Sequence, residues 1–313
     1  MTAARVVVVG SLNTDHVLSV TSLPVRGETV PCLGEVMAHG GKGANQAAAS
    51  AALGLETVFV GAVGADAAGE AGVGELRRAG VDVSAVQRVA GPTGKATVVV
   101  DPDGANFIIV ERGANAALEP DHVHRAITES AGPGSMILAS LEIPLDAVAA
   151  AGQAARHVGA GFVLNPAPAR LLPDDLLSAC DILMPNEVEL AQLQMPPERL
   201  FTLGVGAVVV TRGEEGADLL RPGRRPTRFP ALRVDVRDTT GAGDTFVAAF
   251  CAARTLGFDL DTSCRFAAIA GSLSTTGAGA RGHLPSRPEV ERAMTGDPAS
   301  RGAPWPAPGP TGR

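Results

Sequence analysis

Asp238-Thr239-Thr240-Gly241-Ala242-Gly243-Asp244-Thr245-Phe246 is the stretch of this chain with the clearest chemical content. It follows an extended pattern, Phe229–Val236, and opens an apolar run, 246–250, that predicts a helix. Glycines let the backbone approach a ligand closely, and the free N–H groups and dipole of a helix N-terminus favour a phosphate there. Asp244 lies where these donors converge. The stretch therefore predicts phosphoryl transfer, with Asp244 taking the proton from an attacking hydroxyl.

The same residues also have a purely structural interpretation. Gly-x-Gly before a helix is often only a tight turn, and Asp is a common helix N-cap. Taken alone, the stretch 238–246 supports the two interpretations about equally, so the remainder of the chain must decide between them.

Composition excludes several classes of protein. The chain has 313 residues, 45% of them hydrophobic, and a net charge of -7. This charge provides no basic field for a nucleic acid or an acidic membrane. The N-terminal apolar run, 6–10, is too short for a signal peptide or a membrane span. The cysteines show no Cys-x-x-Cys pair and indicate reduced thiols, so we expect a cytoplasmic protein; they are Cys32, Cys180, Cys251 and Cys264.

Apolar, β-branched runs alternate with Ala-rich segments along most of the chain. The expected strands are 6–9, 57–60, 136–139, 161–164, 181–184 and 207–211, and the expected helices include 46–53, 69–79 and 145–157. This alternation predicts an α/β fold with a central, mostly parallel sheet, and the uniformly apolar strands indicate that helices cover both of its faces.

Two strand-like stretches, about 13–39 and 95–111, lack an intervening helix. The second has turn residues at 101–104 and predicts a β-hairpin. We expect both to form a small β lid over the carboxyl ends of the main sheet, where ligands bind in such folds. Residues 1–295 are thus predicted to form one domain with a lid, and the Pro/Gly-rich segment 296–313 a disordered tail.

A second glycine-rich segment, Gly40-Gly41-Lys42-Gly43-Ala44-Asn45-Gln46, precedes an expected helix and again presents backbone N–H groups, now beside a Lys and an Asn. Asn13 and Asp15 follow the first strand. Each could hydrogen-bond a sugar hydroxyl, and each could equally be a turn residue.

Together, these motifs resemble the ribokinase family of carbohydrate and nucleoside kinases over residues 6–288. Residues 40–45 are similar to its sugar-binding signature, and residues 238–246 are similar to its catalytic signature. Further similar segments are Gly10–Asp15, Gly27–Thr29, Gly113–Ala116, Leu141-Glu142, Asn165–Arg170 and Pro185–Glu187. The resemblance implies a three-layer α/β sandwich and ATP-dependent phosphorylation of D-ribose at O5.

The resemblance also implies roles for individual residues. It makes Asp244 the catalytic base and Gly241, Ala242 and Gly243 the anion hole. Residues similar to the sugar ligands are Asn13, Asp15, Gly41, Lys42, Asn45 and Glu142. Those similar to the ATP-binding set are Asn186, Thr211, Arg212, Gly213, Glu214, Glu215, Gly216 and Gly243. Glu189 is linked to Mg²⁺, and the residues similar to a potassium site are Asp238, Thr240, Ser274, Gly277, Gly279 and Ser286.

Two segments depart from the family pattern. The chain between Glu189 and Val208 is short and contains Pro196-Pro197, which predicts a truncated helix beside the nucleotide loop. The loop Ala280–Ser286 is two residues longer than is usual, which bears on whether Ser286 completes the potassium site.

The resemblance therefore implies a sugar kinase that binds a small sugar and Mg-ATP and is activated by K⁺, and the exposed lid strands predict a homodimer. Two alternatives stay open. One is a related kinase for deoxyribose, a ribonucleoside or a ketohexose. The other is a catalytically weak relative that only binds sugar or nucleotide.

Overall fold

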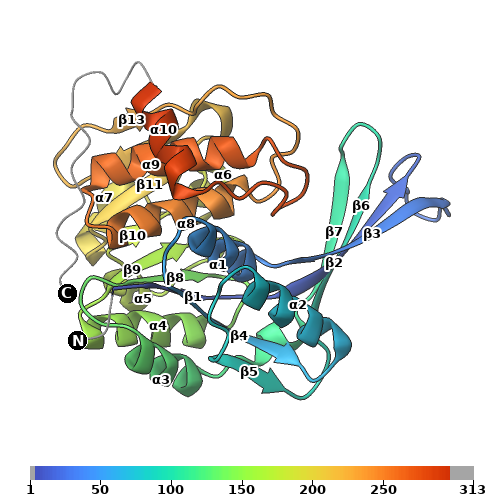
Figure 1. Ribbon diagram of the computed structural model, residues 1–313, viewed down its shortest axis with the longest axis horizontal. Helices are drawn as coiled ribbons and strands as arrows, with labels where there is room; N and C mark the ends of the chain where they lie inside the picture. The colour runs from blue at the N-terminus through green and yellow to red at the C-terminus, as the bar shows by residue number, and fades with distance from the viewer. Residues whose placement is uncertain (1–3, 297–313) are drawn as a thin grey trace.

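A large sheet forms the centre of the protein, which is described here by a computed structural model covering residues 4–296 (Figure 1). Its strands lie in the order β13-β12-β11-β10-β9-β8-β1-β4-β5, and β12 alone among them runs antiparallel to its neighbours. The strands are β1 (Val6–Val9), β4 (Thr57–Gly64), β5 (Val86–Val89), β8 (Met136–Ser140), β9 (Gly161–Asn165), β10 (Ile182–Leu183), β11 (Ala207–Thr211), β12 (Ala217–Leu220) and β13 (Thr227–Phe229). The predicted α/β class with a mostly parallel sheet is confirmed.

Helices cover both faces of this sheet, giving three layers (Figure 1). One face packs against α1 (Lys42–Ala52), α2 (Ala67–Arg78), α8 (Ala242–Thr255), α9 (Leu260–Ser274) and α10 (Arg287–Gly296). The other packs against α3 (Pro120–Ser130), α4 (Leu145–Val158), α5 (Asp174–Ala179), α6 (Glu187–Gln192) and α7 (Pro197–Leu203). Strand β1 shows why the strands are apolar throughout. Val6 and Val8 enter one core, Val7 and Val9 enter the other, and all four are fully buried.

A second, smaller sheet projects from the body of the molecule (Figure 1). It contains β2 (Asn13–Val20), β3 (Cys32–Gly40), β6 (Gly94–Val100) and β7 (Asn106–Glu111) in the order β3-β2-β6-β7. These strands occupy the two stretches predicted to form a lid. We call them the projecting sheet. Because only three residues separate the end of β1 from the start of β2, the base of this sheet lies at the carboxyl edge of the large sheet.

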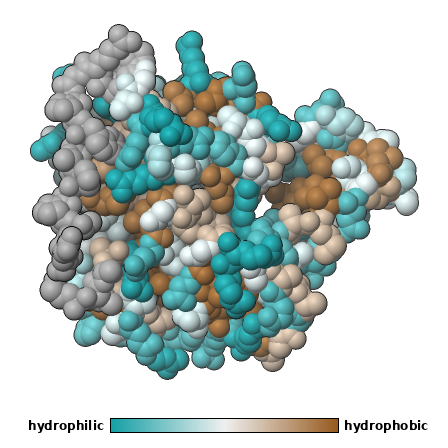
Figure 2. Space-filling model, viewed as in Figure 1, coloured by the Kyte–Doolittle hydropathy of each residue, from teal (hydrophilic) through white to brown (hydrophobic). Residues whose placement is uncertain are grey.

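The register of the projecting sheet shows which side chains share a face. Asp15 lies opposite Ala38 on β3 and Ala96 on β6, and the next row on the same face is Val36, Val17, Val98 and Ile108. Val36 and Ile108 are 62% and 58% exposed. The face that carries Asp15 therefore continues outward into an exposed apolar row, and Figure 2 shows apolar surface gathered on this part of the molecule.

Of the extended stretch expected at Phe229–Val236, only the first residue belongs to a strand. Strand β13 ends at Phe229, and no strand forms at 230–236. Pro230 has no N–H to donate to a neighbouring strand, and the Leu232 N–H donates instead to Ser272 Oγ at 3.0 Å.

The prolines at 196–197 separate two short helices, as expected. Helix α6 ends at Gln192, Pro196 is the N-cap of α7, and Pro197 is its first residue. Helix α1 begins at Lys42, four residues before the expected start.

The predicted tail lies outside the described residues except for Gly296, which ends α10. No helix within residues 4–296 has the length and apolarity needed to cross a membrane.

Candidate active site

The stretch 238–246 forms a turn followed by α8, with Gly241 as the N-cap. Gly241 has φ 75°, and a Cβ there would meet the Ala280 carbonyl oxygen at 2.7 Å, so a residue with a side chain would not fit. The Ala242 N–H donates to Thr239 O at 3.2 Å. Among the described residues, no oxygen accepts a hydrogen bond from the N–H groups of Gly243 and Asp244. These two donors and the helix dipole make the start of α8 suitable for an anion.

Helix α1 brings the second glycine-rich segment against Asp244. The Asp244 carboxylate accepts hydrogen bonds from Asn45 Nδ2 and Gln46 Nε2, both at 3.1 Å. The N-cap of α1 is Gly41 with φ 91°, and a Cβ there would meet the Asn13 N and Ser11 O atoms at 2.9 Å. The two motifs predicted to act together, about two hundred residues apart in sequence, are thus in direct contact.

Opposing effects act on the pKa of Asp244. Its pKa is raised by burial and by Glu142, and this effect is countered by Lys42 and by the hydrogen bonds from Asn45 and Gln46. For Lys42, burial lowers the pKa, but the carboxylates of Asp244, Glu142 and Glu189 outweigh burial and raise it. Lys42 is therefore charged at neutral pH and lies in the field of three carboxylates.

The predicted sugar-binding residues converge on one region. Ser11 Oγ and the Lys42 N–H both donate to Glu142 Oε2, the latter at 3.0 Å. Asn13 Oδ1 accepts a hydrogen bond from Asn115 Nδ2 at 2.7 Å, which leaves the Asn13 amide N–H groups for a ligand. A cavity of about 300 Å³ lies beside Asn13 and Glu142. Its other walls are Val110, Arg112, Asn115, Leu141, Pro168, Ala169 and Arg170.

Asp15 lies at the edge of this region, on the projecting sheet. Burial raises the pKa of Asp15 to about 6, with a further contribution from Glu142, whereas Arg281 and His16 lower it. The pKa of Asp15 is thus close to the physiological range.

The residues predicted to bind ATP lie at two neighbouring strand ends. Asn186 forms a bridge to Thr211, and the Thr211 N–H donates to Pro185 O at 3.0 Å. Asn186 and Glu189 form a capping box at the start of α6, with bonds of 2.7 and 2.8 Å. The pKa of Glu189 is raised by burial and responds to the charges of Lys42 and Asp244, so its carboxylate lies in their neighbourhood.

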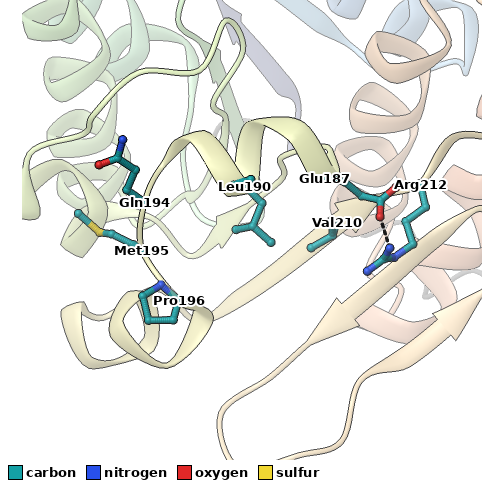
Figure 3. A pocket seen from close by; sticks show the side chains of 8 residues that line it. Glu187, Leu190, Gln194, Met195, Pro196, Val210 and Arg212 are labelled. Atoms are coloured by element: carbon teal, nitrogen blue, oxygen red, sulfur yellow. Dashed lines mark hydrogen bonds and ion pairs between the residues drawn. The ribbon is translucent and has the colours of Figure 1, made fainter.

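Arg212 is held by two carboxylates. Its guanidinium pairs with Glu187 and with Asp218 Oδ2, the latter at 2.6 Å. A second cavity, of about 360 Å³, opens beside this pair, between α6 and β11 where the short α6 ends (Figure 3).

The predicted nucleotide loop follows β11. Gly213 to Glu215 form a short 3-10 helix, η2, and the Gly216 carbonyl oxygen accepts a hydrogen bond from the Arg212 N–H at 2.8 Å. Glu214 and Glu215 are exposed, and Glu215 pairs with Arg228.

Three of the six predicted potassium ligands lie together. The Asp238 carboxylate accepts bonds from the Thr240 N–H at 2.9 Å and the Gly279 N–H at 2.7 Å. Ser274 Oγ instead donates to Gly271 O within α9, and Ser286 precedes α10, where its carbonyl accepts from two N–H groups of that helix. Within residues 4–296, no group of three or more His, Cys, Asp or Glu side chains could hold a metal.

Two contributors were missed by the sequence interpretation. Gln46, which binds Asp244, also donates to Asn165 Oδ1 at 3.2 Å, and Asn165 in turn donates to Met184 O. Arg281, from the loop between α9 and α10, donates to Asn45 Oδ1 at 3.0 Å. Gln46 belongs to a quoted motif and could have been found at its helical position, but no local pattern marks Arg281.

Comparison with known proteins agrees with this geometry. The pfkB family carbohydrate kinase model matches residues 3–287. Ribokinase of Haemophilus influenzae is 35% identical over 295 residues, covering 90% of this chain and 96% of that protein.

Solved structures give the same result. The structure of Arabidopsis thaliana ribokinase complexed with ribose and ATP matches this fold with a TM-score of 0.83 at 35% sequence identity. The match covers 93% of this chain and 98% of the Arabidopsis chain. Ribokinase from Thermotoga maritima has a TM-score of 0.85 at 31% identity, covering 94% of this chain and 100% of that one. The chain belongs to the pfkB family of carbohydrate kinases.

Proposed function

We propose that this protein transfers the γ-phosphoryl group of ATP to O5 of D-ribose, giving ribose 5-phosphate and ADP. The observation that carries the proposal is the Asp244 carboxylate, held by Asn45 and Gln46 beside the free N–H groups that open α8. A positioned base and a preorganised anion site are the two requirements of this reaction, and both are built from the same turn.

In the proposed mechanism, Asp244 accepts the proton of the ribose O5 hydroxyl as O5 forms its bond to the γ-phosphorus. The bond from that phosphorus to the β–γ bridging oxygen breaks, and the electron pair leaves with ADP. The N–H groups of Gly243 and Asp244 stabilise charge on the transferring group, as does Lys42 nearby. Each Asp244 oxygen accepts one bond from an amide, so each retains a lone pair for the proton.

The remaining predicted residues divide between the two substrates. Asp15 and Asn13 hold the vicinal hydroxyls of the sugar, together with Gly41, Lys42, Asn45 and Glu142. Asn186 and the 211–216 loop hold the nucleotide. Glu189 supplies one hard carboxylate oxygen near the site, which fits Mg²⁺ bound mainly through ATP phosphates and water. When bound, Mg²⁺ would neutralise phosphate charge.

A second candidate substrate is a ribonucleoside. The cavity beside Asn13 and Glu142 extends to Val110, Arg112 and Pro168, which leaves space for a group attached to the sugar.

Mg-ATP assays with ribose, deoxyribose, a ketohexose and ribonucleosides distinguish the candidate substrates. We expect the highest kcat/KM with ribose. Preference for a nucleoside would favour the second candidate, and absence of any phosphorylation would favour a binding-only relative.

A cytoplasmic location agrees with the four free thiols of the described chain, one of which, Cys32, is exposed. Cell fractionation tests it, and recovery of the protein outside the cytoplasm would contradict it.

Asp244→Asn tests the base. The amide cannot accept the O5 proton, so kcat should fall by at least about 100-fold, while ribose binding measured by calorimetry is largely kept. Asp259→Asn is the matched control, because Asp259 caps the neighbouring helix α9 and Asn also caps well. Near-normal turnover in Asp244→Asn would remove Asp244 from the mechanism.

The pH dependence of ribose binding tests Asp15. Its carboxylate must be ionised to accept bonds from two hydroxyls, and its pKa is about 6. As pH falls through this value the acid form accumulates, so KM for ribose should rise by up to about tenfold per pH unit below it. Asp15→Asn should show a raised KM without this dependence. A wild-type KM that stays constant between pH 7 and pH 5 would contradict the role.

Potassium activation is proposed from Asp238 and the loop that it binds. Carbonyl and carboxylate oxygens are hard ligands suited to a hard cation, and a cation here would fix the turn that aims the N–H groups of α8. Exchanging Na⁺ for K⁺ at constant ionic strength should raise kcat several-fold. Asp238→Ala should abolish the effect, whereas Asp235→Ala, at an exposed residue nearby, should keep it. Equal rates in the two salts would contradict the site.

A homodimer is proposed from the exposed apolar row on the projecting sheet. Burying Val36, Val17, Val98 and Ile108 against a second copy would remove this surface from water. Ile108→Lys should therefore give monomers in sedimentation velocity. Ile109→Lys is the matched control, because Ile109 is adjacent but lies on the opposite face, and it should keep the dimer. A wild-type protein that sediments as a monomer would contradict the proposal.

A further inference from the structure

Arg281 is a buried arginine that reaches from the 275–286 loop to two distant helices. Its side chain is 12% exposed. Nε donates to Asn45 Oδ1 on α1 at 3.0 Å, and Nη1 pairs with Glu75 Oε1 on α2 at 3.2 Å. Nη2 is buried with no hydrogen-bond partner among the described residues. A buried guanidinium that is only partly satisfied costs stability, so its presence calls for a function.

The contact with Asn45 determines how that amide is oriented. A guanidinium can only donate hydrogen bonds, so the Asn45 atom that faces Arg281 must be the oxygen. The amide nitrogen is then turned toward Asp244, where Nδ2 donates to Oδ2 at 3.1 Å. Glu75, Arg281, Asn45 and Asp244 thus form one chain of polar contacts that ends on the base.

We propose that Arg281 is a positioning residue, which orients Asn45 toward both the sugar and Asp244 and so links the 275–286 loop to the sugar site. This inference rests on the proposed kinase function. The same loop contacts the α8 turn, because the Gly279 N–H donates to Asp238 and Ala280 packs on Gly241. One loop therefore holds the turn that binds the phosphate and, through Arg281, the helix that holds the base.

The positive charge of Arg281 acts on the same groups. It attracts Asp15 and Asp244 without pairing with either. The other charged groups acting on Asp15 are Glu142 and His16, and those acting on Asp244 are Lys42, Glu142 and Glu189. Because Arg281 favours the ionised carboxylates, its removal should raise the pKa of both. The acidic limb of the pH profile, where activity is lost as these carboxylates become protonated, should then move to higher pH.

The test compares Arg281→Ala and Arg281→Lys with wild-type protein and with Arg88→Ala. Arg88, on β5, pairs with Glu70 on α2, the helix that also carries Glu75, so its replacement removes a more exposed ion pair to that helix away from the Asn45 contact. For Arg281→Ala, we expect kcat/KM for ribose to fall by about 10- to 100-fold, the cost of a small misplacement of catalytic groups. KM for ATP should be unchanged, and the acidic limb should shift upward.

Arg281→Lys separates charge from geometry. Lysine keeps the positive charge, so the acidic limb should stay near that of the wild type, but it lacks the planar fork and should recover only part of kcat/KM. Thermal unfolding of each variant corrects for loss of folded protein. Glu75→Ala, which removes the anchor of the guanidinium, should change kcat/KM in the same direction by a smaller factor.

Three results would overturn the inference. One is an Arg281→Ala protein with wild-type kcat/KM and pH profile. Another is a loss of activity that follows the loss of thermal stability with no shift of the acidic limb. The third is an equal loss in Arg88→Ala. A wild-type protein that phosphorylates no sugar would instead refute the proposed function, which is a different outcome.

Discussion

The hydrogen bonds from Asn45 and Gln46 to the Asp244 carboxylate are the interaction on which the site depends. They join the N-terminal turns of α1 and α8, and they occur at the carboxyl edge of the large sheet. A buried carboxylate without such donors would have its charged form strongly disfavoured. The bonds and the charge of Lys42 oppose that effect, and burial still leaves the pKa of Asp244 raised.

The fold explains why these groups meet. Helix α1 begins directly after the projecting sheet returns to the body, and its glycine N-cap allows close approach to the end of β1. Helix α8 packs beside α1 and α9, and the 275–286 loop closes over the α8 turn. The site is therefore formed by loops and helix starts that only the completed sheet brings together, as is usual where ligands bind at the carboxyl ends of parallel strands.

Much of this arrangement could be predicted from the sequence because the signals are local. The apolar runs at Val6–Val9 and Ala207–Thr211 coincide with β1 and β11, and both glycine-rich motifs lie at helix starts. The extended stretch Phe229–Val236 belongs to a strand only at its first residue, because a strand needs a neighbour and apolar character alone does not show whether one is available.

Arg281 could not be predicted for a related reason. Its partner Asn45 is 236 residues away, and nothing in the spacing of the 280–286 loop indicates which of its side chains turns inward. From the sequence, the unusual length of that loop bears only on whether Ser286 completes the potassium site. In the structure the loop has a more specific consequence, since it supplies an arginine to the site.

The central claim is that the two glycine-rich turns form a centre that phosphorylates the 5-hydroxyl of ribose. The most direct measurement is the proton-coupled phosphorus NMR spectrum of the products formed from ribose and Mg-ATP. The account predicts ADP and one new phosphomonoester in equal amounts, with the ester signal split by the two protons on C5. Splitting by a single proton would place the phosphate on another carbon, and release of free phosphate without an ester would mean hydrolysis; either result would contradict the account.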